Sequence, residues 1–251
     1  MTRSEDAISQ LLIALADDEL ILGHRDSEWT GHAPILEEDI AFSNIAQDEM
    51  GHALVWYSLN ERITGQSPDR MAFERPWSEF RCCNFVAQPR GDFAYTVVRQ
   101  FLFDMAEQVR LMSFSGSSYA PLRDAAAKIL KEEGYHMLHT QSLLERLGTG
   151  TEESHRRMQT ALEKAFPQAA GIFEELPMEE RLIVDNVILP NWKLVDAWKA
   201  AVTPILTGAT LTVPPFLYAA TGGRTGKHSD ALRHAVTDIQ SVYRTVPGAS
   251  W

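Results

Sequence analysis

One short motif, an acidic residue followed by Glu-x-x-His, occurs twice in this chain and constrains its fold more than any other feature. The first copy is DEMGH at residues 48–52, and the second is EEGYH at residues 132–136. Side chains three residues apart lie on the same face of a helix, so the glutamate and histidine of one copy can reach one metal ion. The repetition therefore predicts two metal-binding helices, with Glu49, His52, Glu133 and His136 as ligands.

Each copy of the motif also has a carboxylate on the helix before it. Glu19 lies 30 residues before Glu49, and Asp104 lies 29 residues before Glu133. Glu107, one turn after Asp104, is the alternate ligand. Two helix pairs that each supply one carboxylate and one Glu-x-x-His form the ligand set of ferritin-like di-iron proteins. Mixed oxygen and nitrogen ligands suit iron or manganese, so we expect two iron ions, or manganese in their place.

Two further acidic residues directly precede the ligand glutamates. We expect Asp48 and Glu132 each to accept a hydrogen bond from the histidine of the opposite motif, which would fix the tautomer of that imidazole. A third Glu-x-x-His, at residues 152–155, follows a Gly-Thr-Gly-Thr turn and lacks a carboxylate helix before it. Acidic residues are favoured in the first turn of a helix by the dipole alone, so we set this third match aside.

Apolar residues at helical spacing predict an all-α protein, a ferritin-like four-helix bundle with additional C-terminal helices. Ser4 is expected to cap the first helix. We expect a single domain over residues 1–251, with the core bundle at about 4–148 and the helical extension at about 151–251. The irregular stretch 65–92 would be the long crossover that such a bundle needs. The expected helices cover residues 4–25, 35–63, 93–115, 121–147, 152–175, 190–207 and 229–245.

The charge balance and the cysteines exclude several classes of function. A formal net charge of −11 argues against a nucleic-acid-binding protein, which would carry a basic face. The two cysteines, Cys82 and Cys83, are adjacent, which does not suit a structural disulfide or a zinc site. No run of about 20 apolar residues predicts a membrane span. We therefore expect a cytoplasmic protein that binds neither nucleic acid nor a membrane.

A glycine-rich basic loop at residues 221–228 (TGGRTGKH) precedes the last expected helix. Its backbone N–H groups, with Arg224 or Lys227, could contact a phosphate such as those of coenzyme A. The spacing is not that of a P-loop and no strand precedes it, so an ordinary surface turn is the favoured interpretation.

Six stretches of the sequence carry a resemblance to a known family: LGHR (22–25), EWTGHAP (28–34), EEGYH (132–136), LERLG (144–148), the 221–226 loop and VPGASW (246–251). With them the chain resembles the C-type (PaaC) subunit family of bacterial phenylacetyl-CoA epoxidases over nearly its whole length. The resemblance implies a ferritin-like fold and association with a related, PaaA-like catalytic subunit that holds di-iron on the same duplicated motif. C-type subunits look like degenerate relatives that lost much of the first motif, whereas this chain keeps residues 48–52 intact.

Three functions are compatible with these features. The first is a component of a di-iron monooxygenase that epoxidises the ring of an aromatic acyl-CoA, with electrons from a separate reductase because the chain resembles no electron-transfer domain. The second is a non-catalytic structural subunit, and the third is iron or peroxide chemistry on the same fold. We expect a homo-oligomer, a complex with a PaaA-like subunit, or both, with Trp192, Trp198 and Trp251 as candidate interface residues.

Overall fold

The structure, a computed structural model, describes residues 2–217 and 220–246, and within them it contains helices and connecting segments without a strand. The predicted all-α class is therefore confirmed. The chain divides into two compact units. Unit 1 contains residues 1–89 together with 222–251, and unit 2 contains residues 90–221. Whether both fold as the single domain that we expect stays a prediction.

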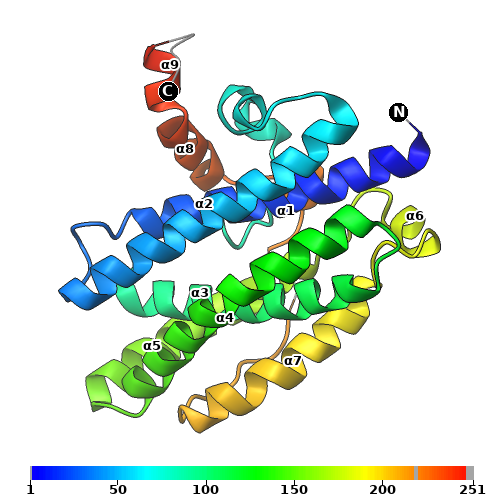
Figure 1. Cartoon of the computed structure of the whole chain (residues 1–251). Helices are drawn as coiled ribbons and strands as arrows, with labels where there is room; N and C mark the ends of the chain where they lie inside the picture. The colour runs from blue at the N-terminus through cyan, green and yellow to red at the C-terminus, as the bar shows by residue number, and fades with distance from the viewer. Residues whose placement is uncertain (1, 218–219, 247–251) are drawn as a thin grey trace. The chain divides into compact units, whose positions relative to one another are not determined.

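Unit 1 is built on a pair of long helices, α1 (Arg3–Ser27) and α2 (Leu36–Thr64), which pack against each other along their length (Figure 1). The cap of α1 is Thr2 rather than the expected Ser4. Thr2 Oγ1 accepts a hydrogen bond from the Glu5 backbone at 3.2 Å, and the Glu5 carboxylate accepts one from the Thr2 backbone at 2.7 Å. This reciprocal capping box places the helix start one residue earlier.

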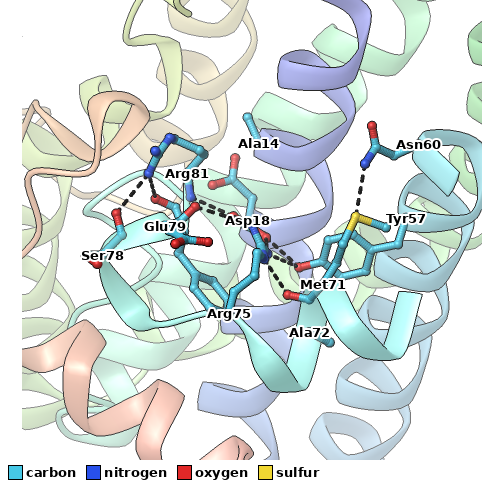
Figure 2. A network of polar contacts seen from close by, with 12 residues as sticks. Ala14, Asp18, Tyr57, Asn60, Met71, Ala72, Arg75, Ser78, Glu79 and Arg81 are labelled. Atoms are coloured by element: carbon cyan, nitrogen blue, oxygen red, sulfur yellow. Dashed lines mark hydrogen bonds and ion pairs between the residues drawn. The ribbon is translucent and has the colours of Figure 1, made fainter. Parts of the chain in front are cut away.

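The segment after α2, residues 65–92, has more regular structure than its prolines and glycines suggest. It contains a short π-helix (Arg70–Glu74) and a 3₁₀ turn (Trp77–Glu79), and it buries Phe80, Phe85 and Val86 in unit 1. Arg75 fastens it by donating hydrogen bonds to the Tyr57 hydroxyl and to two backbone carbonyls of the segment (Figure 2).

The C-terminal residues return to unit 1 instead of extending the other helices. The 3₁₀ turn Gly223–Thr225 is followed by α8 (Asp230–Ile239), which packs on α1, and by the short α9 (Ser241–Thr245). Arg25 holds this return by donating to the backbone carbonyls of Ala87, at 3.1 Å, and Ala231, at 2.9 Å.

Unit 2 contains the second long pair, α3 (Phe93–Ser113) and α4 (Ala120–Gly148), with three helices added. Trp198 is fully buried, and its indole N–H donates to the Leu102 carbonyl at 3.0 Å. This indole is therefore a core residue of the unit, whereas Trp192 is exposed and Trp251 lies outside the described residues. The added helices are α5 (Glu152–Ala169), α6 (Glu179–Val184) and α7 (Asn191–Gly208).

The helices follow from the sequence pattern in both units. The apolar stripe of α1, including Leu11, Leu12, Leu15 and Leu22, is buried, as amphipathic spacing requires. Each unit thus holds one of the two helix pairs of a ferritin-like bundle, and each pair carries one copy of the repeated motif. In the described part of the chain no helix is both long enough and apolar enough to cross a membrane.

Candidate metal centre

The first three predicted ligands gather inside unit 1. Glu19 on α1 and Glu49 and His52 on α2 are all buried, and one ligand atom from each lies within 4.8 Å of the others. His52 Nδ1 is 3.7 Å from Glu49 Oε2. The Glu-x-x-His spacing therefore places a carboxylate and an imidazole side by side, and the helix pairing brings Glu19 to them.

A glycine allows the two helices to approach at this point. A Cβ atom on Gly23 would lie 3.0 Å from the Ala46 carbonyl oxygen and 3.0 Å from the Glu49 Cβ. Both contacts are tighter than most real Cβ contacts, and the Ala46 carbonyl is backbone that cannot rotate away. Gly23, one turn after Glu19, thus sets the separation of α1 and α2 beside the triad.

The second set of predicted ligands lies inside unit 2. Asp104 on α3 and Glu133 and His136 on α4 are buried. His136 Nδ1 is 3.4 Å from Glu133 Oε1, and one ligand atom of Asp104 lies within 4.8 Å of one of His136. Unit 2 therefore repeats the arrangement of one carboxylate from the first helix of a pair and a Glu-x-x-His from the second.

Two neighbours orient the Asp104 carboxylate. Gln100 Nε2 donates to Asp104 Oδ1 at 2.8 Å, and Thr140 Oγ1 donates to Asp104 Oδ2 at 2.9 Å. Sequence reasoning missed both residues. Thr140 stands four residues after His136 and so shares its helix face, which is the signal that could have identified it.

Glu107, the alternate ligand, is buried in unit 2, and its role as a ligand stays a prediction. Its carboxylate forms an ion pair with Arg110 on the same helix, and Arg110 also donates to the Ile172 carbonyl at 3.0 Å. The negative charge of Glu107 is therefore balanced by a buried guanidinium, which connects α3 to the segment after α5.

The donor atoms of both sets fit a transition metal. Each set contains two carboxylates and one imidazole, the mixture of oxygen and nitrogen ligands that iron and manganese accept. Burying two carboxylates side by side, as with Glu19 and Glu49, is costly, because desolvation and mutual repulsion both oppose it. A bound cation would offset both costs, so these residues can hold a metal.

The remaining motif residues lie outside these clusters. Asp48 and Glu132 are exposed, and their expected hydrogen bonds, each to a histidine of the other unit, stay predictions. His155 of the third Glu-x-x-His faces the Gly148 carbonyl, with Nδ1 2.8 Å from that oxygen, while Glu152 is exposed. These contacts agree with the exclusion of the third match from the ligand set.

The proposed phosphate contact at Arg224 needs correction. Its guanidinium is buried and forms an ion pair with Asp18 of α1, with Nη2 2.7 Å from Oδ2. If this guanidinium moved to a phosphate, it would leave the Asp18 carboxylate buried without a counter-charge, which is costly. Lys227 remains exposed, and its contact with a phosphate stays a prediction.

Sequence reasoning also missed the two aspartates that precede Glu19. Asp17 and Asp18 are fully buried, and each pairs with an arginine far away in the chain, Asp17 with Arg75 and Asp18 with Arg224. Three consecutive buried acids in one helix are a sign of long-range basic partners, but nothing in their spacing identifies those partners.

An all-α chain with a buried carboxylate and imidazole set on each of two repeated helix pairs defines a helical protein of the ferritin-like class, with residues that could hold a metal. A family model described as "Phenylacetic acid catabolic protein" matches residues 1–251, and the chain belongs to this family. The C-type subunit of 1,2-phenylacetyl-CoA epoxidase from Escherichia coli (strain K12) is 34% identical over 240 residues, covering 95% of this chain and 97% of that relative. The A-type subunit of the same epoxidase is 25% identical over 158 residues, covering 63% of this chain and 51% of that relative.

Proposed function

We propose that this chain is a component of a multicomponent phenylacetyl-CoA 1,2-epoxidase and holds a di-iron site itself. The observation that carries the proposal is the complete duplicated ligand set, including the Glu19, Glu49 and His52 cluster inside unit 1. Its similarity to the C-type subunit of an epoxidase over most of both chains supports the same reaction. In this proposal the full set of ligands is Glu19, Glu49 and His52 from unit 1 and Asp104, Glu133 and His136 from unit 2.

The chain's own residues have defined tasks in this function. The four carboxylates neutralise the two cations and the two imidazoles complete the ligand set. Asp104 rather than Glu107 is the ligand from α3, because Glu107 is paired with Arg110 while Asp104 is oriented by Thr140 and Gln100. Bound iron would supply the activation of dioxygen, and the buried apolar helices around it would exclude bulk water.

The proposed enzyme needs other components. The similarity to both the A-type and the C-type subunits supports a complex with a PaaA-like partner. Because a di-iron oxygenase must be reduced in each turnover and this chain resembles no electron-transfer domain, we propose that a separate reductase supplies the electrons. The second candidate is a purely structural role, favoured by the higher identity to the C-type relative.

Metal analysis of the purified chain tests the proposal. We expect two iron ions per chain after reconstitution with ferrous iron, measured by inductively coupled plasma mass spectrometry. His52→Ala and His136→Ala should each reduce the iron content, whereas His155→Ala, in the third Glu-x-x-His, should not. A wild-type chain without bound iron would instead support the structural role.

Circular dichroism separates loss of a ligand from loss of the fold in these variants. We expect the helical signal of both ligand variants to stay at the wild-type level, because each unit buries many apolar residues away from the triads. Unchanged iron content in His52→Ala would refute its role as a ligand.

A further inference from the structure

A pocket of about 310 Å³ lies within unit 2, away from the ligand residues Asp104, Glu133 and His136. Its wall is formed by the start of α3 and by one face of α5. The lining residues of α5, at positions 156, 157, 160, 161 and 164, recur with helical spacing and so lie on one side of the helix. The lining residues are Gly91, Asp92, Tyr95, Arg156, Arg157, Thr160, Ala161 and Lys164.

The charge of this pocket is opposite to that of the chain as a whole. The chain carries a net charge of −11, yet Arg156, Arg157 and Lys164 line the pocket against one lining carboxylate, Asp92. The Lys164 ammonium lies over the Tyr95 ring, 4.6 Å from its centre, and forms no ion pair with the described carboxylates. Such a local cluster attracts anions in spite of the negative chain.

The start of α3 adds positive potential to the same pocket. The first turn of a helix carries a partial positive charge from its backbone N–H groups, and Asp92 and Tyr95 belong to this end of α3. Gly91 has a φ of +71°, and a Cβ there would lie 2.9 Å from the Tyr95 ring. The tight turn therefore needs glycine. The Tyr95 hydroxyl is buried and accepts or donates no hydrogen bond among the described residues, which leaves a donor at this wall.

The two arginines of the pocket both form ion pairs with Glu153, which lies one turn before them on α5. Glu153 accepts two hydrogen bonds from Arg156 Nη2, at 2.7 and 2.9 Å, and one from Arg157 Nε at 2.7 Å. All three side chains are exposed, so these ion pairs contribute little to stability and can exchange partners. Glu153 thus occupies the position that the oxygens of a phosphate would take between the two guanidiniums.

We propose that this pocket binds the phosphate groups of a coenzyme A thioester, with Arg157 and Lys164 as the main contacts and Glu153 as an internal competitor. The proposal rests on the proposed function, in which the substrate is an acyl-CoA. It adds that the phosphate groups of this substrate bind to unit 2. Ligand pockets span about 300–1,000 Å³, so this one accommodates one end of a coenzyme A molecule and leaves the acyl group outside.

Isothermal titration of the full chain with coenzyme A tests the assignment. Lys164→Ala and Arg157→Ala should each weaken binding about tenfold, the usual effect of one charge-assisted hydrogen bond. Lys193→Ala, a lysine on the ring of Trp192, and Arg181→Ala, an arginine paired with Asp185, are matched controls outside the pocket and should bind as wild type.

Glu153→Ala gives the most specific outcome, since removing an acidic residue should tighten coenzyme A binding severalfold if the carboxylate competes with phosphate. Unchanged affinity in Lys164→Ala and Arg157→Ala would overturn the assignment of coenzyme A to this pocket, while the proposal of an acyl-CoA substrate would stand.

Dephospho-coenzyme A, ADP and inorganic phosphate form the other arms of the titration. Equal affinity for inorganic phosphate and coenzyme A would show a general anion site and overturn the coenzyme A assignment. The iron content of each variant, measured in parallel, tests the metal site independently.

Discussion

Arg224 and Asp18 form a bidentate ion pair in the interior of unit 1, although 206 residues separate them in the chain. Nη1 donates to Oδ1 at 2.8 Å and Nη2 donates to Oδ2 at 2.7 Å. The Cys83 backbone N–H also donates to Asp18, at 2.7 Å. Because Asp18 immediately precedes Glu19, this ion pair braces α1 next to a proposed metal ligand.

Breaking this pair should destabilise the chain strongly. We expect Arg224→Met to lower the free energy of unfolding by about 3–5 kcal/mol, because it leaves the Asp18 carboxylate buried without its counter-charge. Urea unfolding followed by circular dichroism measures the change. Arg233→Met, which removes an exposed partner of Asp230, is the matched control and should change stability by less than about 1 kcal/mol. A small effect at Arg224 would contradict the bracing role.

Thr140 should matter for metal affinity more than for the fold. Thr140→Val removes the hydrogen bond to Asp104 Oδ2 while keeping the shape of the side chain. Loss of such an orienting partner typically lowers metal affinity by about 10–100-fold, so we expect that range in a competition titration with a chelator. Thr203→Val removes a similar hydroxyl that bonds only to its own helix, and it should leave affinity unchanged. Equal affinities in the two variants would exclude Asp104 as an oriented ligand.

His24 should make part of the stability depend on pH. Burial lowers the pKa of His24 below its usual value near 6.5, and Glu28 only partly opposes this. As the pH falls, the unfolded chain therefore takes up a proton on His24 before the folded chain does. The stability that comes from keeping His24 neutral is fully present above about pH 6.5, and it is lost as the pH falls toward the pKa of the folded chain. We expect the unfolding free energy of His24→Gln to fall less than that of wild type between pH 7 and pH 5. Parallel curves for the two proteins would refute the shift.

A face of α2 is the expected contact for a PaaA-like partner. Leu36, Ile40, Met50 and Leu54 are exposed on α2, and an exposed apolar stripe on one helix is typical of a binding surface. Leu54→Glu should weaken the complex at least tenfold in a titration with the PaaA-like partner, since it would bury an unpaired charge. Val184→Glu, at an exposed apolar residue of α6 in unit 2, should have no effect. Wild-type binding by Leu54→Glu would place the contact elsewhere.

Much of this protein follows from its sequence alone because the decisive signals are local. The period of the apolar residues predicts the four long helices α1 to α4 and also α7 to within about two residues, but it misses α6 and runs past the end of α5. The Glu-x-x-His spacing alone places Glu49 beside His52 and Glu133 beside His136. The offset of 30 residues also predicts Glu19, since two adjacent helices joined by a short turn must run antiparallel. These features depend on backbone geometry that any helix of this sequence shares.

Only the tertiary structure shows which residues, distant in the chain, pair with a buried charge or line the same pocket. The sequence shows neither that Asp18 is buried nor that Arg224 neutralises it, and it contains a basic loop without revealing that the arginine of this loop is already paired. Similarly, Lys164 and Gly91 line one pocket only because α5 packs on α3. A sequence pattern encodes which face of a helix is covered. The partner that covers it is selected by the packing and charge balance of the whole unit, which no local spacing contains.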